Sequence, residues 1–282
     1  MNQHTIAQEV SIKGIGLHSG CAVELCLKPA AENSGIVFKR SDLPGQPEVK
    51  ALYSQVADTR NCTCLAAGDC IVSTIEHLMA ALAVLEIDNL LIEVNDREMP
   101  IMDGSALPFW QLLSRIGVRE QTAPRRRLKV LKEVSFSDEK GNSISLLPAD
   151  QFAVEMEIEF PSKIVGRQKF DAVVTPETFA AQIAPCRTFC EKYQVDYLKS
   201  VGLIKGGSLE NAVVLDGDTV LNPEGFRLEN ECVNHKVIDI IGDMYTAGYQ
   251  IIGKVIARKT GHFHNNEVLK KLFADHDNYE IR

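Results

Sequence analysis

The sequence predicts an α+β protein of two domains, each a mainly antiparallel sheet with helices packed on one face. Residues 21–27 and 152–160 alternate apolar side chains with other side chains, which is typical of half-buried strands. In both halves of the chain an apolar helix pattern is followed by an apolar strand pattern. Because the two halves repeat this succession, they are predicted to form two similar units.

The remaining elements follow from the same patterns. The predicted segments are a buried helix ending at Ile87, a strand at 89–94, a helix at about 234–245, one strand at 251–257 and a helix at 267–273. Ser73 and Glu76 have capping-box spacing at the start of the first helix. Asn265 or Asn266 is expected to cap the last helix.

The domain boundary is predicted at 120–127, where a Pro and three arginines interrupt the apolar pattern. The first domain then spans 1–122 and the second spans 126–282. Gly206-Gly207, Gly217 and Asn222-Pro223 mark residues 192–223 as an insertion in the second domain, with a short helix and strands of its own.

Composition excludes several classes of function. Apolar residues make up 45% of the 282, charged residues 24%, and the net charge is −8. A nucleic-acid binder needs a basic face, which this charge argues against. No stretch reaches the ~20 apolar residues of a transmembrane helix, and the N-terminus lacks the pattern of a signal peptide. We therefore expect a cytoplasmic monomer with eight reduced cysteines.

Two short patterns suggest a metal site. His235 and Asp239 are four residues apart, so they lie on one face of a helix and can share a cation or form a solvated pair. Glu76 and His77 begin a helix that is apolar on nearly all sides, so their side chains must find buried partners. His77, His235 and Asp239 would supply the three protein ligands of a catalytic zinc site, with Glu76 as the base.

His262 follows Gly261, just past the end of a predicted strand and before a predicted helix. A loop histidine in this position is suited to acid catalysis, and a surface histidine is the alternative.

Taken together, the motifs resemble one family, the UDP-3-O-acyl-N-acetylglucosamine deacetylases. The segments that carry the resemblance span almost the whole chain in order: GIGLHSG (14–20), STIEHLMAAL (73–82), PIMDGS (100–105), GRQKF (166–170), RTFC (187–190), KGGSLENAVV (205–214), LNPEGFRLENE (221–231), HKVIDIIGD (235–243) and GH (261–262). The resemblance implies an active site between the helix layers of two domains. It also implies hydrolysis of the substrate acetamide in the first committed step of lipid A synthesis in Gram-negative bacteria.

The resemblance further implies residue roles. Zn²⁺, or Fe²⁺ in its place, would be held by His77, His235 and Asp239. Glu76 would be the general base, His262 the general acid, Asp243 its partner, and Thr188 the donor to the oxyanion. Lys236 would meet the anionic nucleotide, His18 would lie near the sugar, and Phe189 and Phe160 would offer flat contact surfaces. The insertion would form the acyl passage, with walls of Tyr197, Leu198, Val201, Leu203 and Ile204.

Two other functions stay open at this point. The chain could be a different zinc amidohydrolase or peptidase with the same ligands. It could also be a binding protein for acylated sugar nucleotides with a structural metal, although such a site takes four protein ligands and only three candidates are found.

Overall fold

The computed structural model describes all 282 residues and confirms the α+β class. Six α-helices are present: α1 (Glu76–Val84), α2 (Leu107–Ile116), α3 (Pro176–Thr178), α4 (Lys192–Ser200), α5 (Glu231–Tyr245) and α6 (His262–Phe273). The short helices η1 (Tyr53–Gln55), η2 (Phe179–Ile183) and η3 (His276–Asn278) complete the helical part.

The first half of the chain forms a five-stranded sheet in the order β2-β3-β9-β4-β5. These strands are β2 (Val10–Ile15), β3 (Ala22–Pro29), β9 (Leu90–Val94), β4 (Ile36–Arg40) and β5 (Glu48–Lys50). Only the pairing of β4 with β9 is parallel. Val23, Leu25 and Leu27 are buried along β3, as their alternation predicts. A three-stranded sheet of β6 (Val56–Asp58), β7 (Cys64–Ala67) and β8 (Cys70–Ser73) precedes α1.

The second half forms another five-stranded sheet in the order β12-β13-β20-β14-β15. Its strands are β12 (Val134–Ser137), β13 (Ser143–Leu147), β20 (Lys254–Arg258), β14 (Ala153–Glu159) and β15 (Arg167–Val173). Three smaller sheets are formed by β1 (Asn2–Ile6) with β10 (Val118–Pro124), by β19 (Gln250–Ile252), β11 (Arg127–Val130) and β21 (Tyr279–Ile281), and by β16 (Phe189–Glu191), β17 (Val213–Asp216) and β18 (Thr219–Val220). Helix α4 and strands β17 and β18 lie in the segment predicted as an insertion.

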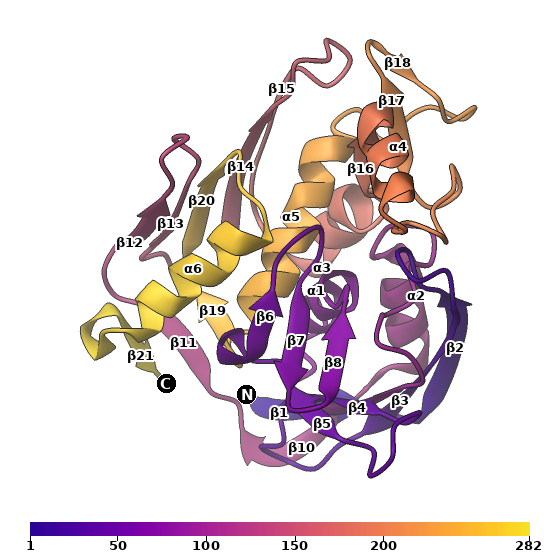
Figure 1. Cartoon of the computed structure of the whole chain (residues 1–282). Helices are drawn as coiled ribbons and strands as arrows, with labels where there is room; N and C mark the ends of the chain where they lie inside the picture. Colours follow the sequence, from indigo (N-terminus) through magenta and orange to yellow (C-terminus); the bar gives the residue numbers. More distant parts are fainter.

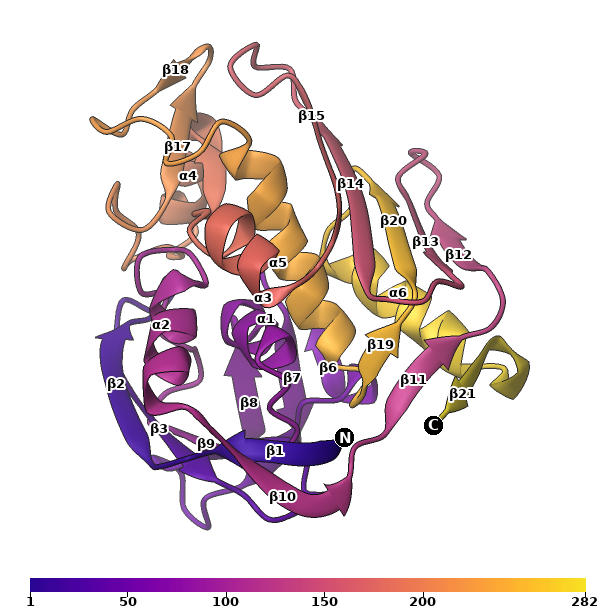
Figure 2. The same cartoon turned by 180° about the vertical axis from the view of Figure 1, so that it is seen from behind.

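Helices α1, α2, α5 and α6 lie between the two five-stranded sheets, whereas α4 lies beside β16 and β17 (Figures 1 and 2). Helix α1 packs against α5, α5 contacts β14 and β15, and α6 contacts β12 and β13. Gly242 permits the close approach of α1 and α5, because a Cβ atom there would lie 2.1 Å from the carbonyl oxygen of Glu76. The division into domains at 122 and 126 stays a prediction. In the structure β10 runs through this region and pairs with β1.

Three local predictions are wrong. The single strand expected at 251–257 is two strands that separate at Gly253 and join different sheets. A Cβ atom at Gly253 would lie 2.8 Å from Val130 and 3.0 Å from the carbonyl oxygen of Leu147, so the chain turns where only glycine fits.

The other two corrections concern helix starts. Helix α6 begins at His262 with Gly261 as its N-cap, so Asn265 and Asn266 lie inside the helix. Helix α1 has Ile75 as its N-cap and no capping side chain, so Ser73 and Glu76 form no capping box. None of the helices is long and apolar enough to cross a membrane.

Candidate metal centre and active site

Helix α1 places two polar side chains in the protein interior. Glu76 and His77 form its first turn. They are buried because the apolar residues that follow them in α1 are packed in the core. Glu76 is not engaged in capping its own helix. Its Oε2 instead accepts the backbone N–H of Thr63 over 3.1 Å.

Helix α5 presents His235, Asp239 and Asp243 at intervals of four residues, and all three are buried. The Nδ1 atom of His235 lies 3.1 Å from the carbonyl oxygen of Cys186. A proton on Nδ1 would be donated to that carbonyl, which leaves the lone pair of Nε2 free for a cation. Nε2 lies 3.6 Å from Oδ1 of Asp239.

His77, His235 and Asp239 form a buried cluster that fits a metal ion. One ligand atom from each residue lies within 4.8 Å of the others. Burial lowers the pKa of His77 to about 3, so its imidazole is neutral and can coordinate. Burial acts to raise the pKa of Asp239, but Lys236 and His235 outweigh it and hold that pKa below its usual range. Two neutral imidazoles and one carboxylate are a donor set of catalytic zinc sites.

Lys236 lies beside this cluster. Its Nζ is 2.6 Å from Oδ2 of Asp239, and the side chain faces the same cavity. Burial acts to lower the pKa of Lys236, and the Asp239 carboxylate outweighs it, so the ammonium stays charged.

The Glu76 carboxyl and the His262 imidazole lie close together beside the cluster. Burial raises the pKa of Glu76 to about 7. The Nε2 atom of His262 lies 3.9 Å from Glu76 Oε1, and its Nδ1 lies 2.8 Å from Asp243 Oδ2. Although burial acts to lower it, Asp243 and Asp239 raise the pKa of His262 to about 9. At neutral pH His262 is therefore protonated and can donate a proton, and Asp243 holds its imidazole through Nδ1.

Sequence reasoning missed two residues that hold Asp243. The hydroxyl of Thr63 donates to Oδ1 over 2.5 Å, and the Nδ2 atom of Asn265 donates to Oδ2 over 2.8 Å. The only sequence signal was that a buried carboxylate needs donors for both oxygens. Thr63 is distant in sequence from Asp243, so nothing local could have identified it.

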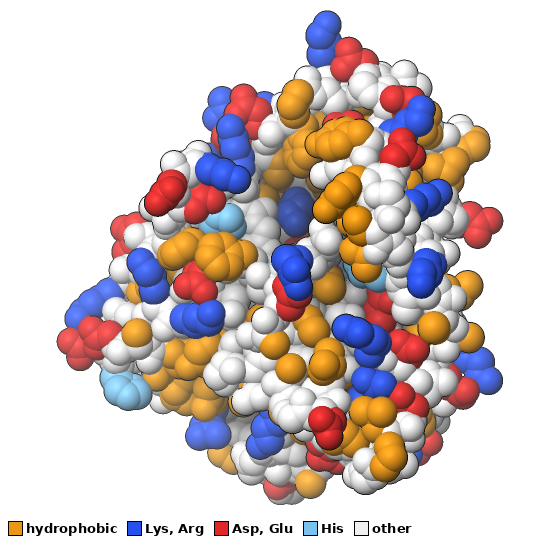
Figure 3. Space-filling view, in the orientation of Figure 1, with side chains coloured by type: hydrophobic (Ala, Val, Ile, Leu, Met, Phe, Trp, Pro, Cys, Tyr) orange, Lys and Arg blue, Asp and Glu red, His pale blue; other side chains and the backbone are white.

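A cavity of about 890 Å³ contains the cluster. Every predicted site residue lines it except Asp243, which lies behind His262. Figure 3 shows the face on which it opens as a hollow with hydrophobic side chains along its walls. Phe160 and Phe189 meet edge to face in its wall, with ring centroids 5.3 Å apart. Of the predicted acyl-passage residues, Tyr197, Leu198 and Ile204 line this cavity, whereas Val201 and Leu203 do not.

Three polar atoms in the cavity wall have no partner. His18 Nδ1, Thr74 Oγ1 and His264 Nδ1 are buried without a hydrogen bond, and all three residues line the cavity. Thr74 also has a positive φ of 62°, which is costly for a β-branched residue. Unpaired buried groups of this kind are available to a bound molecule.

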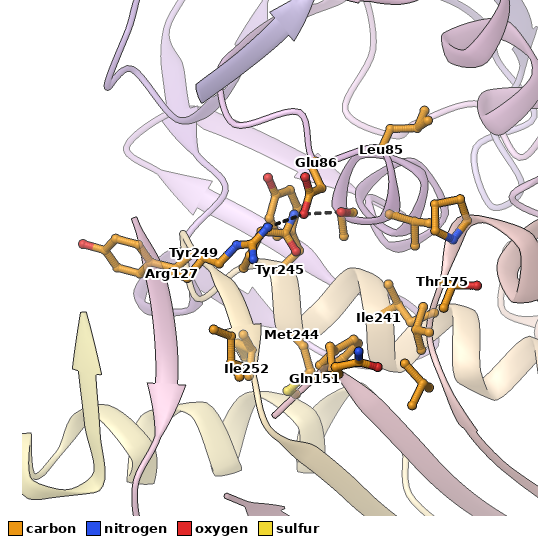
Figure 4. Close-up of a pocket in the computed structure, with 18 of the residues that line it drawn as sticks. Leu85, Glu86, Arg127, Gln151, Thr175, Ile241, Met244, Tyr245, Tyr249 and Ile252 are labelled. Atoms are coloured by element: carbon orange, nitrogen blue, oxygen red, sulfur yellow. Dashed lines mark hydrogen bonds and ion pairs between the residues drawn. The ribbon is translucent and has the colours of Figure 1, made fainter. Parts of the chain in front are cut away.

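A second cavity of about 520 Å³ lies near the C-terminal ends of α1 and α5 (Figure 4). Three of its polar side chains are already paired. Arg127 donates to Glu86 over 2.7 Å, and Gln250 donates to the carbonyl oxygen of Ala83 over 2.7 Å. None of the predicted site residues lines it, and no unpaired polar group points to a ligand.

The chain is similar to known proteins over almost its whole length. Residues 3–274 match the family model described as UDP-3-O-acyl N-acetylglycosamine deacetylase. A UDP-3-O-acyl-N-acetylglucosamine deacetylase of Myxococcus xanthus is 44% identical, over 99% of this chain and 89% of its own length. The proteins of the same name from Phenylobacterium zucineum (43%, over 100% and 97%) and Shewanella violacea (44%, over 99% and 92%) are equally similar. The chain therefore belongs to the UDP-3-O-acyl-N-acetylglucosamine deacetylase family.

Proposed function

We propose that this chain hydrolyses the acetamide of UDP-3-O-acyl-N-acetylglucosamine and releases acetate. As a member of its family it is a deacetylase of lipid A biosynthesis. The observation that carries the proposal is the buried cluster of His77, His235 and Asp239, which shares one cavity with an opposed carboxylate and imidazole.

We assign zinc to this cluster, with Fe²⁺ as the alternative that the same donors accept. The family is metal-dependent. His77 and His235 would bind through imidazole nitrogens and Asp239 through a carboxylate oxygen. When bound, the metal supplies a Lewis acid that polarises the substrate carbonyl and makes a bound water more acidic.

The residues around the cluster carry the protons. Glu76 accepts a proton from the water that attacks the acetamide carbon. The Thr188 hydroxyl donates a hydrogen bond to the carbonyl oxygen as negative charge develops on it. His262 then gives its proton to the sugar nitrogen as the C–N bond breaks, so that the products are acetate and a free amine. Asp243 holds His262 in orientation and in its charged form.

The rest of the cavity would recognise the substrate. Lys236 would meet the anionic nucleotide once a metal ion takes over the Asp239 carboxylate. His18 brings an unpaired ring nitrogen to the sugar. Phe160 and Phe189 offer apolar ring faces, and the acyl chain would follow the walls formed by residues 192–223.

Two further parts of the proposal concern the whole chain. Residues 1–122 and 126–282 are proposed as two domains, with α1 and α5 bringing their site residues together. The cytoplasm is the proposed compartment, because all eight cysteines are free thiols and such thiols persist under reducing conditions.

The test is acetate release from UDP-3-O-acyl-N-acetylglucosamine by the purified protein. Activity should disappear on chelation and return with stoichiometric zinc. Simple acetylated peptides serve as the control substrate, and equal activity on them would favour a general amidohydrolase. A folded, zinc-loaded protein that releases no acetate would contradict the proposal and favour a binding protein.

A further inference from the structure

A buried ion pair lies one helical turn before His235. Arg187 immediately precedes Thr188, and its side chain is 1% exposed, while Glu231 in the first turn of α5 is 0% exposed. Nε of Arg187 donates to Oε1 of Glu231 over 2.8 Å, and Nη2 donates to Oε2 over 3.2 Å. The planar guanidinium therefore contacts the carboxylate at two points.

Glu231 also binds the backbone of the residues around it. The backbone N–H of Arg187 donates to Oε1 over 2.9 Å, and that of Arg227 donates to Oε2 over 2.6 Å. Arg187 in turn donates through Nη2 to the carbonyl oxygen of Gly225 over 2.7 Å. One carboxylate thus gathers three donors of the buried Arg187 and one of Arg227. Losing it would leave the backbone N–H and the Nε of Arg187 unpaired away from water.

Residues 186–188, whose backbone is held by these bonds, carry two groups of the proposed active site. The carbonyl of Cys186 faces Nδ1 of His235 at 3.1 Å, and Thr188 lines the cavity. Glu231 and His235 are four residues apart, so they lie on one face of α5. The ion pair and the contact between Cys186 and His235 are therefore successive contacts between the same segment and the same helix face.

We propose that Arg187 and Glu231 are positioning residues that set residues 186–188 in register with α5. The pair aims Nε2 of His235 at the metal and the Thr188 hydroxyl at the substrate carbonyl. This inference rests on the proposed function, because His235 and Thr188 have their roles there. A buried ion pair adds little net stability compared with apolar residues of similar size. The groups that orient a ligating imidazole, in contrast, are worth roughly 10–100-fold in metal affinity or activity.

Arg187→Lys tests the proposal, because lysine keeps the charge but loses the two-point contact. Arg125→Lys is the matched control. Arg125 is also 1% exposed, donates to Asp88 over 2.9 Å and to the carbonyl oxygen of Glu86 over 2.6 Å, and lies outside the cavity. Both substitutions should lower Tm. Only Arg187→Lys should weaken zinc affinity in a chelator competition, about tenfold, and lower kcat while KM stays unchanged.

Glu231→Asp is the second variant and decides the question if Arg187→Lys does not fold. It keeps the negative charge but withdraws the carboxylate by one methylene, so the same losses of zinc affinity and kcat are expected. The proposal is overturned if the variants lose only Tm, as the Arg125 control does, and keep wild-type zinc affinity and kcat. Failure of the proposed function would be distinct, because the unsubstituted protein would then bind no zinc or release no acetate.

Discussion

Glu76 and His262 are the titrating residues of the proposed reaction. At a pH between their two pKa values, Glu76 is deprotonated and His262 is protonated. Burial raises the pKa of Glu76 to about 7, and although burial acts against it, Asp243 and Asp239 raise that of His262 to about 9. Glu76 must be deprotonated to accept a proton, so activity falls as the pH drops through its pKa. His262 must be protonated to donate, so activity falls as the pH rises through its pKa. A bound dication lowers both values, since positive charge favours the deprotonated forms.

The first prediction is that Asp243→Asn moves the basic limb of kcat/KM to lower pH. The amide removes the negative charge that most strongly raises the pKa of His262, so the imidazole loses its proton at a pH lower by about 1. His262→Ala should abolish that limb and cut turnover. The measurement is kcat/KM against pH with zinc content checked for each variant. An unchanged basic limb in both variants would assign the acid to another group.

Glu76→Ala should retain zinc and lose most activity. Glu76 lies outside the candidate ligand set, and the proposed function makes it the acceptor of the proton from the attacking water. Loss of a general base typically costs roughly 10²–10⁴-fold in rate. Metal analysis and acetate release on the same sample check both halves of the prediction. If zinc is lost as well, Glu76 is a ligand or an element of the fold.

Thr63 joins Glu76, the proposed base, and Asp243, the partner of the proposed acid. It donates its backbone N–H to Glu76 and its hydroxyl to Asp243. Thr63→Val keeps the size and the backbone donor but removes the hydroxyl. Because hydrogen bonds to charged groups are worth about 1.5–3 kcal/mol, kcat should fall roughly tenfold or more. Thr63→Ser, which restores the hydroxyl, should recover most of the rate, and a serine variant as slow as valine would contradict this role.

At the scale of elements, the crossing of α1 and α5 depends on Gly242. A Cβ atom there would overlap the carbonyl oxygen of Glu76 at 2.1 Å, so Gly242→Ala must push the helices apart. This would displace Asp239 and Asp243 relative to Glu76 and His77. We expect Tm to fall by several degrees and acetate release to fall at least tenfold, although alanine is the better helix former. Gly141→Ala, at a turn with nothing within 4 Å, is the control for glycine replacement away from the site: its φ of +81° should cost some Tm through backbone strain, but acetate release should stay unchanged.

The elements that the sequence predicts well are those whose burial follows a strict period. Alternation identified β3 and β14, and the spacing of His235, Asp239 and Asp243 identified one face of α5. The errors occur where tertiary contacts decide. Gly253 breaks a continuous apolar run because Val130 and Leu147 approach its backbone.

Helix starts were harder to predict because a local motif competed with a distant partner. The Glu76 carboxylate had the spacing for a capping box, but it accepts the N–H of Thr63 instead. Gly261, rather than either asparagine, precedes the first residue of α6. Asn265 lies inside that helix and donates to Asp243, a contact that no pattern in its neighbourhood encodes.

At the scale of the whole molecule, the candidate metal site joins the two halves of the chain. His77 comes from α1, whereas His235 and Asp239 come from α5, and the two helices pack against each other. The Lys236 ammonium is the positive charge nearest to the Asp239 carboxylate, at 2.6 Å. A ligand that binds only the folded chain adds to its stability according to its concentration relative to Kd.

Zinc should therefore stabilise the protein as well as activate it. At a free concentration of about 100 times Kd the gain is about 2.7 kcal/mol, which corresponds to a rise in Tm of several degrees. The measurement is thermal unfolding of the chelated protein against a zinc titration. His77→Ala and His235→Ala, which each remove one ligand, should flatten the titration even though the residues lie in different halves. If only the His235 variant does so, the cation is held by α5 alone and the two halves are not joined through it.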